Sequence, residues 1–200
     1  MKESEQKAAA KKFAEAWKGR GYEKGETHKV IDPLFLDALK KEFEEIKETK
    51  QPKTRKQKWK DFQKKLASLT FLDPASGSGN FLTETYISLR RLENEALKEQ
   101  LGVEIVLGEL DNPIQVSIGQ FYGIEINDFA VTVAKTALWI AEAQMMAETE
   151  NIVHMNLDFL PLKSYANIVE GNALTLDWTH VVPRDKVDYI MGNPPLGGYN

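Results

Sequence analysis

"FLDPASGSGNFL", residues 71–82 of this 200-residue chain, has the pattern of a strand, a glycine-rich turn and the start of a helix. Apolar residues before Asp73 predict a buried strand over 69–73 ("LTFLD"), and apolar spacing after Asn80 predicts a helix over 80–99. Between them, Gly77 and Gly79 lack a Cβ, so the backbone can turn tightly and approach a ligand closely. We expect Ser78 or Asn80 to cap the helix, whose free N–H groups favour a carboxylate or phosphate.

The turn lies where ligands bind in parallel sheets, beyond the carboxyl end of a strand. No Lys-Ser or Lys-Thr pair follows the glycines, so the turn is not a phosphate loop of the Walker type. It also departs from G-x-G-x-x-G, because position 82 is a leucine. A G-x-G turn by itself is equally compatible with a plain structural turn.

Short apolar runs and helical patterns continue to alternate after this turn. Further strands are predicted at 121–126 ("FYGIEI"), 167–171 ("NIVEG") and 187–192 ("VDYIMG"), and residues 100–120 lengthen the first crossover. A helix over 128–149 is capped by Asn127 or Asp128, and it is apolar on most sides, which predicts that it is well buried. This order predicts an α/β fold with a Rossmann-like, doubly wound parallel sheet.

Residues 1–66 predict a helical N-terminal region, followed by an α/β unit over 67–200. A helix over 33–47 is expected, with Asp32 as its cap and Pro33 in its first position. Its apolar positions at helical spacing are Leu34, Phe35, Ala38, Leu39, Phe43 and Ile46.

The segment 47–65 is strongly basic. It holds eight lysines and one arginine against Glu48 and Asp61, a net charge of +7. Trp59, Phe62, Leu66 and Leu69 lie on one helical face of this region. Two interpretations stay open: an amphipathic surface helix with a solvated basic side, or a patch that contacts phosphates.

Composition excludes several classes of protein. Apolar residues make up 42% and charged residues 28%, as in a globular chain, and no apolar run is long enough for a membrane span. The polar N-terminus lacks a signal core, so a cytoplasmic location is expected. The absence of cysteine excludes disulfides and thiolate sites, and the three histidines follow no ligand spacing, so no metal is expected. The net charge of −4 does not exclude a nucleic-acid partner.

Two polar residues at later strand ends are candidates for ligand contact. Glu125 ends the second strand, where an acid in a dinucleotide fold accepts hydrogen bonds from ribose hydroxyls. It lies 46 residues past Gly79 rather than about twenty, because of the insertion at 100–120. The alternative is a surface glutamate. Asn172 in "EGNAL" could bond an adenine edge or act as an ordinary turn former.

"NPPL", residues 193–196, follows the fourth strand and should face the same crevice. Pro194 and Pro195 fix the backbone and leave carbonyls free to accept, and Asn193 adds a side-chain carbonyl. Acceptors in a rigid frame suit a planar amino group, whose nitrogen becomes nucleophilic when both its protons are bound. Positioning in line with a methyl donor would then carry most of the catalysis.

At these residues the chain resembles class I S-adenosylmethionine-dependent DNA methyltransferases that act on the exocyclic amino group of adenine. It is most similar to large single-chain restriction–modification proteins with nuclease, methyltransferase and recognition parts, over about residues 70–200. The resemblance implies two groups of site residues. The cofactor would be bound by Asp73, Ala75, Gly77, Gly79, Asn80, Phe81, Glu125, Ile126, Asn172 and Ala173, and the catalytic motif would be Asn193, Pro194, Pro195 and Leu196.

Three departures from this family shape the expectations. Leu196 replaces the aromatic residue that would stack on a flipped base, a contact worth roughly 1–3 kcal/mol. We expect the nuclease-bearing region to be missing, with a join near residues 28–30, and the chain stops after the catalytic motif. We therefore expect a truncated or internally deleted member that is inactive alone. Its partners would be double-stranded DNA, in a complete enzyme, and a C-terminal chain.

Two alternative functions stay open from the sequence. One is methylation of protein glutamine or RNA, because Asn-Pro-Pro turns also serve planar amino groups there. The other is a non-catalytic, cofactor-binding remnant or a piece of a split protein.

Overall fold

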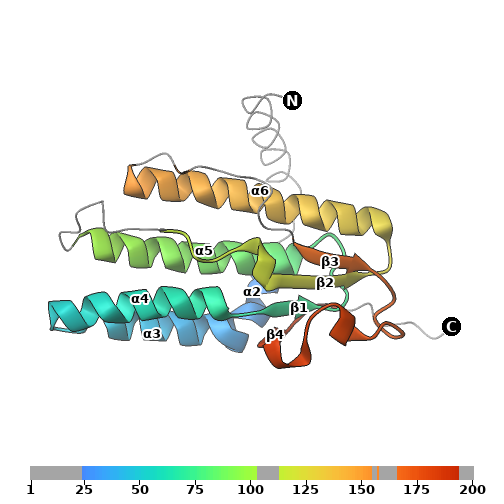
Figure 1. Ribbon diagram of the computed structural model, residues 1–200, viewed down its shortest axis with the longest axis horizontal. Helices are drawn as coiled ribbons and strands as arrows, with labels where there is room; N and C mark the ends of the chain where they lie inside the picture. The colour runs from blue at the N-terminus through green and yellow to red at the C-terminus, as the bar shows by residue number, and fades with distance from the viewer. Residues whose placement is uncertain (1–23, 103–112, 155–156, 158–165, 194–200) are drawn as a thin grey trace.

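The computed structural model describes residues 24–102, 113–154, 157 and 166–193 (Figure 1). The N-terminal helices are α2 (Lys24–Ile31), a π-helical turn η1 (Asp32–Leu36), α3 (Asp37–Lys47) and α4 (Pro52–Ser68). The α/β part comprises β1 (Phe71–Asp73), α5 (Asn80–Leu101), β2 (Phe121–Glu125), α6 (Asp128–Val153), β3 (Asn167–Glu170) and β4 (Tyr189–Ile190). Three short 3₁₀ turns are η3 (Ile118–Gln120), η4 (Trp178–His180) and η5 (Arg184–Lys186).

The four strands form one parallel sheet in the order β3-β2-β1-β4. Alternate residues of β1 face opposite sides: Phe71 packs with α5 and α6, whereas Leu72 packs with Val182 in the segment between β3 and β4. Both α5 and α6 therefore cover one face, and the chain returns to β4 across the other (Figure 1). This confirms the predicted α/β fold with a parallel sheet, although the strands are shorter than the sequence indicated.

The N-terminal helices add to the core on the α5 face. The Phe35 ring packs at a tilt against Phe71 and Tyr189, with ring centroids 5.0 and 5.2 Å away. Phe43 and Trp59 join α3 to α4 with centroids 4.8 Å apart. The predicted apolar face of α4 is confirmed, because Trp59, Phe62, Leu66 and Leu69 are all buried.

The predicted start of the N-terminal helix at Asp32 is wrong. Ile31 already has helical dihedral angles, and the Asp37 N–H donates to the Asp32 carbonyl five residues back, so α2, η1 and α3 form a continuous helical path. The Asp32 carboxylate accepts a 2.8 Å hydrogen bond from His28 Nδ1 instead of capping a helix. Leu34 and Ala38, predicted on the apolar face, are exposed.

The two long helices differ at their starts. Gly79 is the N-cap of α5 and no side chain caps this helix, so the predicted capping by Ser78 or Asn80 is wrong. Asn127 caps α6, as predicted, and its Oδ1 accepts from the Ala130 N–H at 3.1 Å. The expectation that α6 is buried on most sides is wrong, because one side of it is exposed, including Phe129 at 74%.

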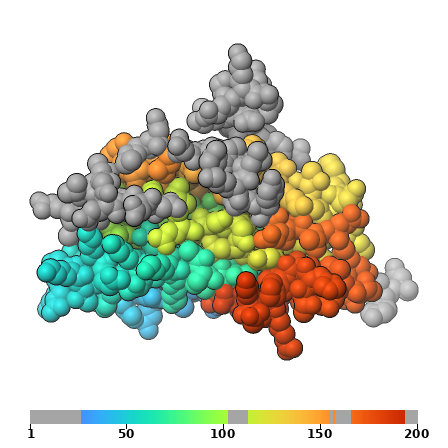
Figure 2. Space-filling view, viewed as in Figure 1, coloured from blue at the N-terminus to red at the C-terminus, as the bar shows by residue number. Residues whose placement is uncertain are grey.

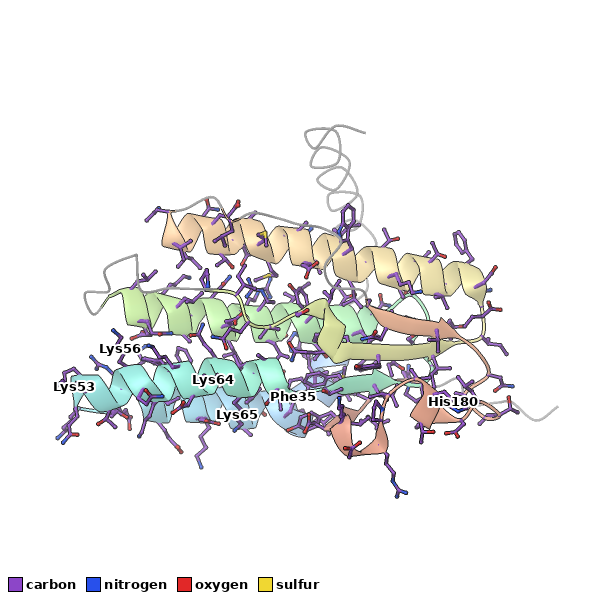
Figure 3. All side chains as sticks on the ribbon, viewed as in Figure 1. Phe35, Lys53, Lys56, Lys64, Lys65 and His180 are labelled. Carbon is purple, nitrogen blue, oxygen red and sulfur yellow. The ribbon has the colours of Figure 1, made fainter. Side chains whose placement is uncertain are left out.

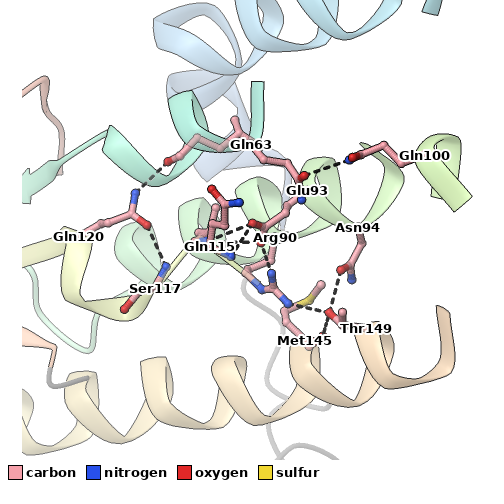
Figure 4. A network of polar contacts seen from close by, with 12 residues as sticks. Gln63, Arg90, Glu93, Asn94, Gln100, Gln115, Ser117, Gln120, Met145 and Thr149 are labelled. Atoms are coloured by element: carbon pink, nitrogen blue, oxygen red, sulfur yellow. Dashed lines mark hydrogen bonds and ion pairs between the residues drawn. The ribbon is translucent and has the colours of Figure 1, made fainter. Parts of the chain in front are cut away.

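A buried polar network holds α5 against its neighbours (Figure 4). Arg90 pairs with Glu93 and donates to Thr149 Oγ1 of α6 at 2.6 Å. The Glu93 carboxylate also accepts from the backbone N–H groups of Gln115 and Val116, at 2.7 and 3.2 Å to Oε1. The two charges thus pair with each other inside the core, and the Glu93 carboxylate fixes the approach of the chain to β2. No helix in the described part of the chain is long and apolar enough to span a membrane.

Candidate functional site

Four polar segments meet at one edge of the sheet. The glycine turn follows β1, Glu125 ends β2, Asn172 follows β3 and Asn193 follows β4. Because all four strands are parallel, their carboxyl ends lie on the same side, where such sheets bind ligands. The fold thus gathers at one edge candidates that are up to 120 residues apart in the sequence.

The two glycines of the turn have different surroundings. Both have positive φ angles, 52° for Gly77 and 81° for Gly79, which favour glycine. A Cβ on Gly77 would meet nothing within 4 Å, so this side of the turn is open. A Cβ on Gly79 would lie 2.9 Å from Ala134 Cβ on α6. The missing Cβ of Gly79 therefore serves helix packing, whereas we expected it to serve the approach of a ligand.

The turn is also fastened to β2. The Ser76 N–H donates to the Ile124 carbonyl at 3.0 Å, and the Ser76 hydroxyl lies over Gly123, where a Cβ would come within 3.0 Å of Oγ. The small buried side chain of Ser76 fits this contact. Sequence reasoning missed the role of Gly123, which lies inside the strand and gives only a weak signal.

Asp73 is a buried carboxylate at the centre of the edge. Its side chain is 1% exposed, and Oδ1 accepts from the Ala75 N–H at 3.0 Å. Burial raises the pKa of the Asp73 carboxyl from 3.8 to about 6; the Ala75 hydrogen bond opposes this rise and the charge of Glu125 adds to it. A cationic group bound beside Asp73 would relieve the cost of its charge.

The backbone of Gly192 passes against Asp73. A Cβ on Gly192 would lie 2.5 Å from Asp73 Oδ1 and 3.1 Å from its Cγ. Any residue other than glycine would therefore force the Asp73 side chain or the backbone at this position to move. Gly192 immediately precedes Asn193, and the carboxylate therefore touches the start of the predicted catalytic loop. Sequence reasoning missed this contact, although the glycine in "MGNPP" was a signal that a backbone approaches closely there.

Glu125 closes the glycine turn from the neighbouring strand. Its Oε2 accepts from the Gly77 N–H at 2.8 Å, and its Oε1 accepts from the Asn127 N–H at 3.0 Å. A carboxylate has about four acceptor positions, so the two oxygens can still accept from hydroxyl groups. Ile126, the next residue, is 67% exposed and offers an apolar surface beside the acid.

The remaining candidates line the rim of the edge. Ala75, Asn80 and Phe81 are half-buried along the turn and the first residues of α5. Asn172 Oδ1 accepts from the Leu174 N–H at 3.0 Å, which is the turn-forming role, and its amide NH₂ is on an exposed residue. Ala173 is half-buried, and its carbonyl accepts from Trp178 Nε1 at 2.8 Å.

Asn193 is exposed at the end of β4. Pro194, Pro195 and Leu196 lie outside the described residues. An open groove of about 590 Å³ adjoins the start of this loop, lined by Lys29, Val30, Pro33, Leu34, Pro74, Ile190, Met191 and Gly192. Helix α2 and the π-helical turn thus contribute one wall next to Asn193.

This arrangement fits a nucleoside-bearing cofactor with a cationic end. The open side of Gly77 leaves space at the turn, Asp73 supplies a buried negative charge, and Glu125 supplies acceptors for hydroxyls. Among the described residues, no group of three His, Cys, Asp or Glu side chains could hold a metal ion.

Comparisons with known proteins agree on one kind of relative. The model of the MmeI DNA-methyltransferase domain family matches residues 47–200. DNA methyltransferase A of Bacillus subtilis is 42% identical over 173 residues, which are 85% of this chain and 19% of the relative. A putative type II restriction enzyme and methyltransferase of Methanocaldococcus jannaschii is 30% identical over 83 residues, which are 40% of this chain and 6% of the relative.

The structure is also similar to the solved type IIL restriction–modification enzyme MmeI in complex with DNA. The TM-score is 0.76 at 39% identity, over 86% of this chain and 22% of the MmeI chain. The chain therefore spans about a fifth of the length of DNA methyltransferase A and of MmeI.

Proposed function

Because this chain belongs to the MmeI DNA-methyltransferase domain family, we propose that it forms the cofactor-binding half of a restriction–modification methyltransferase. The reaction would transfer a methyl group from S-adenosylmethionine to the exocyclic amino group of adenine in double-stranded DNA. The observation that carries this proposal is the juxtaposition of Asp73, the glycine turn, Glu125 and Asn193 at one sheet edge. Membership of the family confirms the resemblance seen in the sequence.

The cofactor would lie along the glycine turn. S-adenosylmethionine, when bound, supplies an electrophilic methyl group on a sulfonium. Asp73, Ala75, Gly77 and Gly79 would border its methionine end, with Asn80 and Phe81 beside them at the start of α5. Glu125 would accept from the ribose hydroxyls, Ile126 would pack on the adenine ring, and Asn172 with Ala173 would border the adenine edge.

The target amino group would be held by the loop after β4. Asn193 Oδ1 and the carbonyl of Pro194 would accept its two protons, and Pro195 would keep the loop rigid. Because Gly192 rests on Asp73, Asn193 would lie next to the reactive end of the bound cofactor. Positioning of this kind supplies a large share of catalysis in group transfer.

The open groove beside Asn193 would receive the unstacked base. Its wall includes the apolar side chains of Val30 and Leu34, which are 38% and 42% exposed. Leu196 supplies no aromatic face for stacking, so this apolar surface would carry part of that role. Since the proposed reaction would act on DNA inside the cell, we also propose a cytoplasmic location, and a further chain would supply the recognition part.

The first test is calorimetric titration of the chain with S-adenosylmethionine. Gly77→Val should weaken binding at least tenfold, because its side chain would enter the open side of the turn and β-branched residues resist positive φ. Gly102→Val at the far end of α5 is the control for glycine replacement in general. Equal affinity for the parent and Gly77→Val would contradict the proposed cofactor site.

The second test measures methyl transfer. The matched segment of Bacillus subtilis DNA methyltransferase A is replaced by this chain, and labelled methyl is followed into duplexes with and without adenine. Transfer to the adenine-containing duplex alone, lost with Asn193→Ala, would support the reaction. Transfer that is independent of adenine would exclude it. Leu196→Phe should raise the rate if base stacking limits capture.

A further inference from the structure

One face of α4 carries a row of exposed lysines. Lys53, Lys60 and Lys64 lie seven and four residues apart, which is close to two turns and one turn of helix, so they share one side of α4. We call these three residues the lysine stripe. Figure 3 labels Lys53 and Lys64 along α4, and Figure 2 shows α4 uncovered on this face of the molecule.

Three other lysines nearby pair with carboxylates. Lys65 pairs with Glu42 of α3 at 2.5 Å, Lys47 pairs with Glu99 of α5 at 3.4 Å, and Lys41 reaches Glu45 at 4.0 Å. Within the described ranges, no carboxylate lies within 4.0 Å of the ammonium groups of Lys53, Lys60 or Lys64, and all three residues are exposed. The stripe therefore carries positive charge that no described carboxylate balances.

The stripe has the dimensions of a phosphate-contacting surface. Lys53 and Lys64 are eleven residues apart in the helix, which is about 17 Å at 1.5 Å per residue. A DNA strand presents one phosphate for about every 3.4 Å of axis, so this length faces about five phosphates. Lysine is a point charge without the planar fork of arginine, which favours contact with backbone phosphates over reading of bases.

The position of the stripe separates it from the candidate active site. Helix α4 ends at Ser68 and β1 begins at Phe71, so α4 leads into the amino end of the strand. The glycine turn and Asn193 lie at the opposite, carboxyl ends of the strands. DNA bound to the stripe would thus contact the protein away from the base that is methylated. This contact would not depend on the base sequence of the DNA.

We propose that the lysine stripe of α4 is a sequence-independent anchor for the phosphate backbone of double-stranded DNA, distinct from the methyl-transfer site. This proposal rests on the proposed function for the choice of DNA as the partner. It does not depend on methyl transfer or on cofactor binding. Each lysine that contacts a phosphate releases counterions, so the stripe should make affinity fall steeply as salt rises.

The test compares two triple variants of the full chain that remove the same number of charges. The stripe variant is K53Q/K60Q/K64Q, and the control is K41Q/K47Q/K65Q, whose lysines already pair with carboxylates. Binding to a fluorescent mixed-sequence duplex of about 30 base pairs is followed by anisotropy between 50 and 200 mM salt. Circular dichroism verifies that both variants keep the helical content of the parent.

Loss of three phosphate contacts should reduce the slope of log affinity against log salt by about 2.7, at 0.9 per contact. Between 50 and 200 mM salt, the parent should therefore lose about 40-fold more affinity than the stripe variant does. The control should stay within one unit of the parental slope. Equal slopes for the two variants, or no DNA binding by the parent, would overturn the anchor. A separate titration with S-adenosylmethionine distinguishes its failure from failure of the proposed function, because the stripe variant should bind cofactor like the parent.

Discussion

Replacing Asp73 with asparagine should stabilise the ligand-free protein at neutral pH. The folded protein raises the pKa of this buried carboxyl from 3.8 to about 6, so its charged form is less favourable in the fold than in the unfolded chain. This rise corresponds to about 3 kcal/mol of unfolding free energy, since one pKa unit is worth about 1.4 kcal/mol. Asparagine keeps the Oδ1 acceptor for the Ala75 N–H and removes the charge.

The sign of the pH dependence follows from proton binding. Below about pH 3 the carboxyl is protonated in both states, so parent and Asp73→Asn should differ little. As pH rises from about 3 to 7, the unfolded chain loses its proton first and the folded parent loses stability. Above about pH 7 the difference should stay constant, at up to about 3 kcal/mol in favour of the variant, or about 6–12 °C in melting temperature.

Urea unfolding followed by circular dichroism at pH 4, 5, 6, 7 and 8 measures this difference directly. Asp185→Asn, at an exposed position, is the matched control and should show no such window. A difference that is the same at every pH, or a variant less stable than the parent at pH 7, would refute the buried-charge reasoning. If the proposed cofactor site is correct, the same variant should bind S-adenosylmethionine more weakly, since it lacks the charge that would face the cationic end of the cofactor.

Three further predictions follow from the site and its supports. Gly192→Ala should lower stability and cofactor affinity because its Cβ would collide with the Asp73 carboxylate. Asp73→Ala in the same chain should restore much of the stability. Additive losses of the two substitutions in urea unfolding would refute the contact. His28 lies between two carboxylates that raise its pKa, the Asp32 hydrogen bond most strongly, so its stabilising effect should be present below about pH 6.5 and disappear as pH rises through the raised value. The expected sign is that His28→Gln costs stability at pH 6 and little at pH 9, and a constant cost would contradict it. Gly79→Leu should destabilise the fold itself, through contact with Ala134, and a melting temperature equal to that of the parent would disprove this packing role.

Much of the fold could be predicted from local signals. The strand run before Asp73, the helical spacing after Asn80 and the Asn127 cap depend on neighbours within a few residues, which sequence periodicity records directly. The alternation of strands and helices predicts a parallel sheet, and a parallel sheet places Glu125 and Asn193 at the same edge. All these signals involve residues that are close to one another in the sequence.

Errors arose where packing decided between equivalent local choices. Asp32 has the residue type of a helix cap, yet the helix continues through it as a π-helical turn. Its carboxylate accepts a hydrogen bond from His28 instead of capping the helix. One exposed side of α6 has no covering element in the described part of the chain, although its composition suggested burial.

The order of strands and helices, and the place of the glycine turn between the first strand and its helix, could be predicted from the sequence alone. Only the tertiary structure decided that Gly79 packs on Ala134 while Gly77 faces open space, and that Gly192 rests on the carboxylate of Asp73. It also decided that Arg90 and Glu93 neutralise each other inside the core. The physical reason is distance along the chain: the contact of Asp73 with Gly192 joins residues more than 100 positions apart, and close packing, which no local pattern encodes, sets which such groups meet.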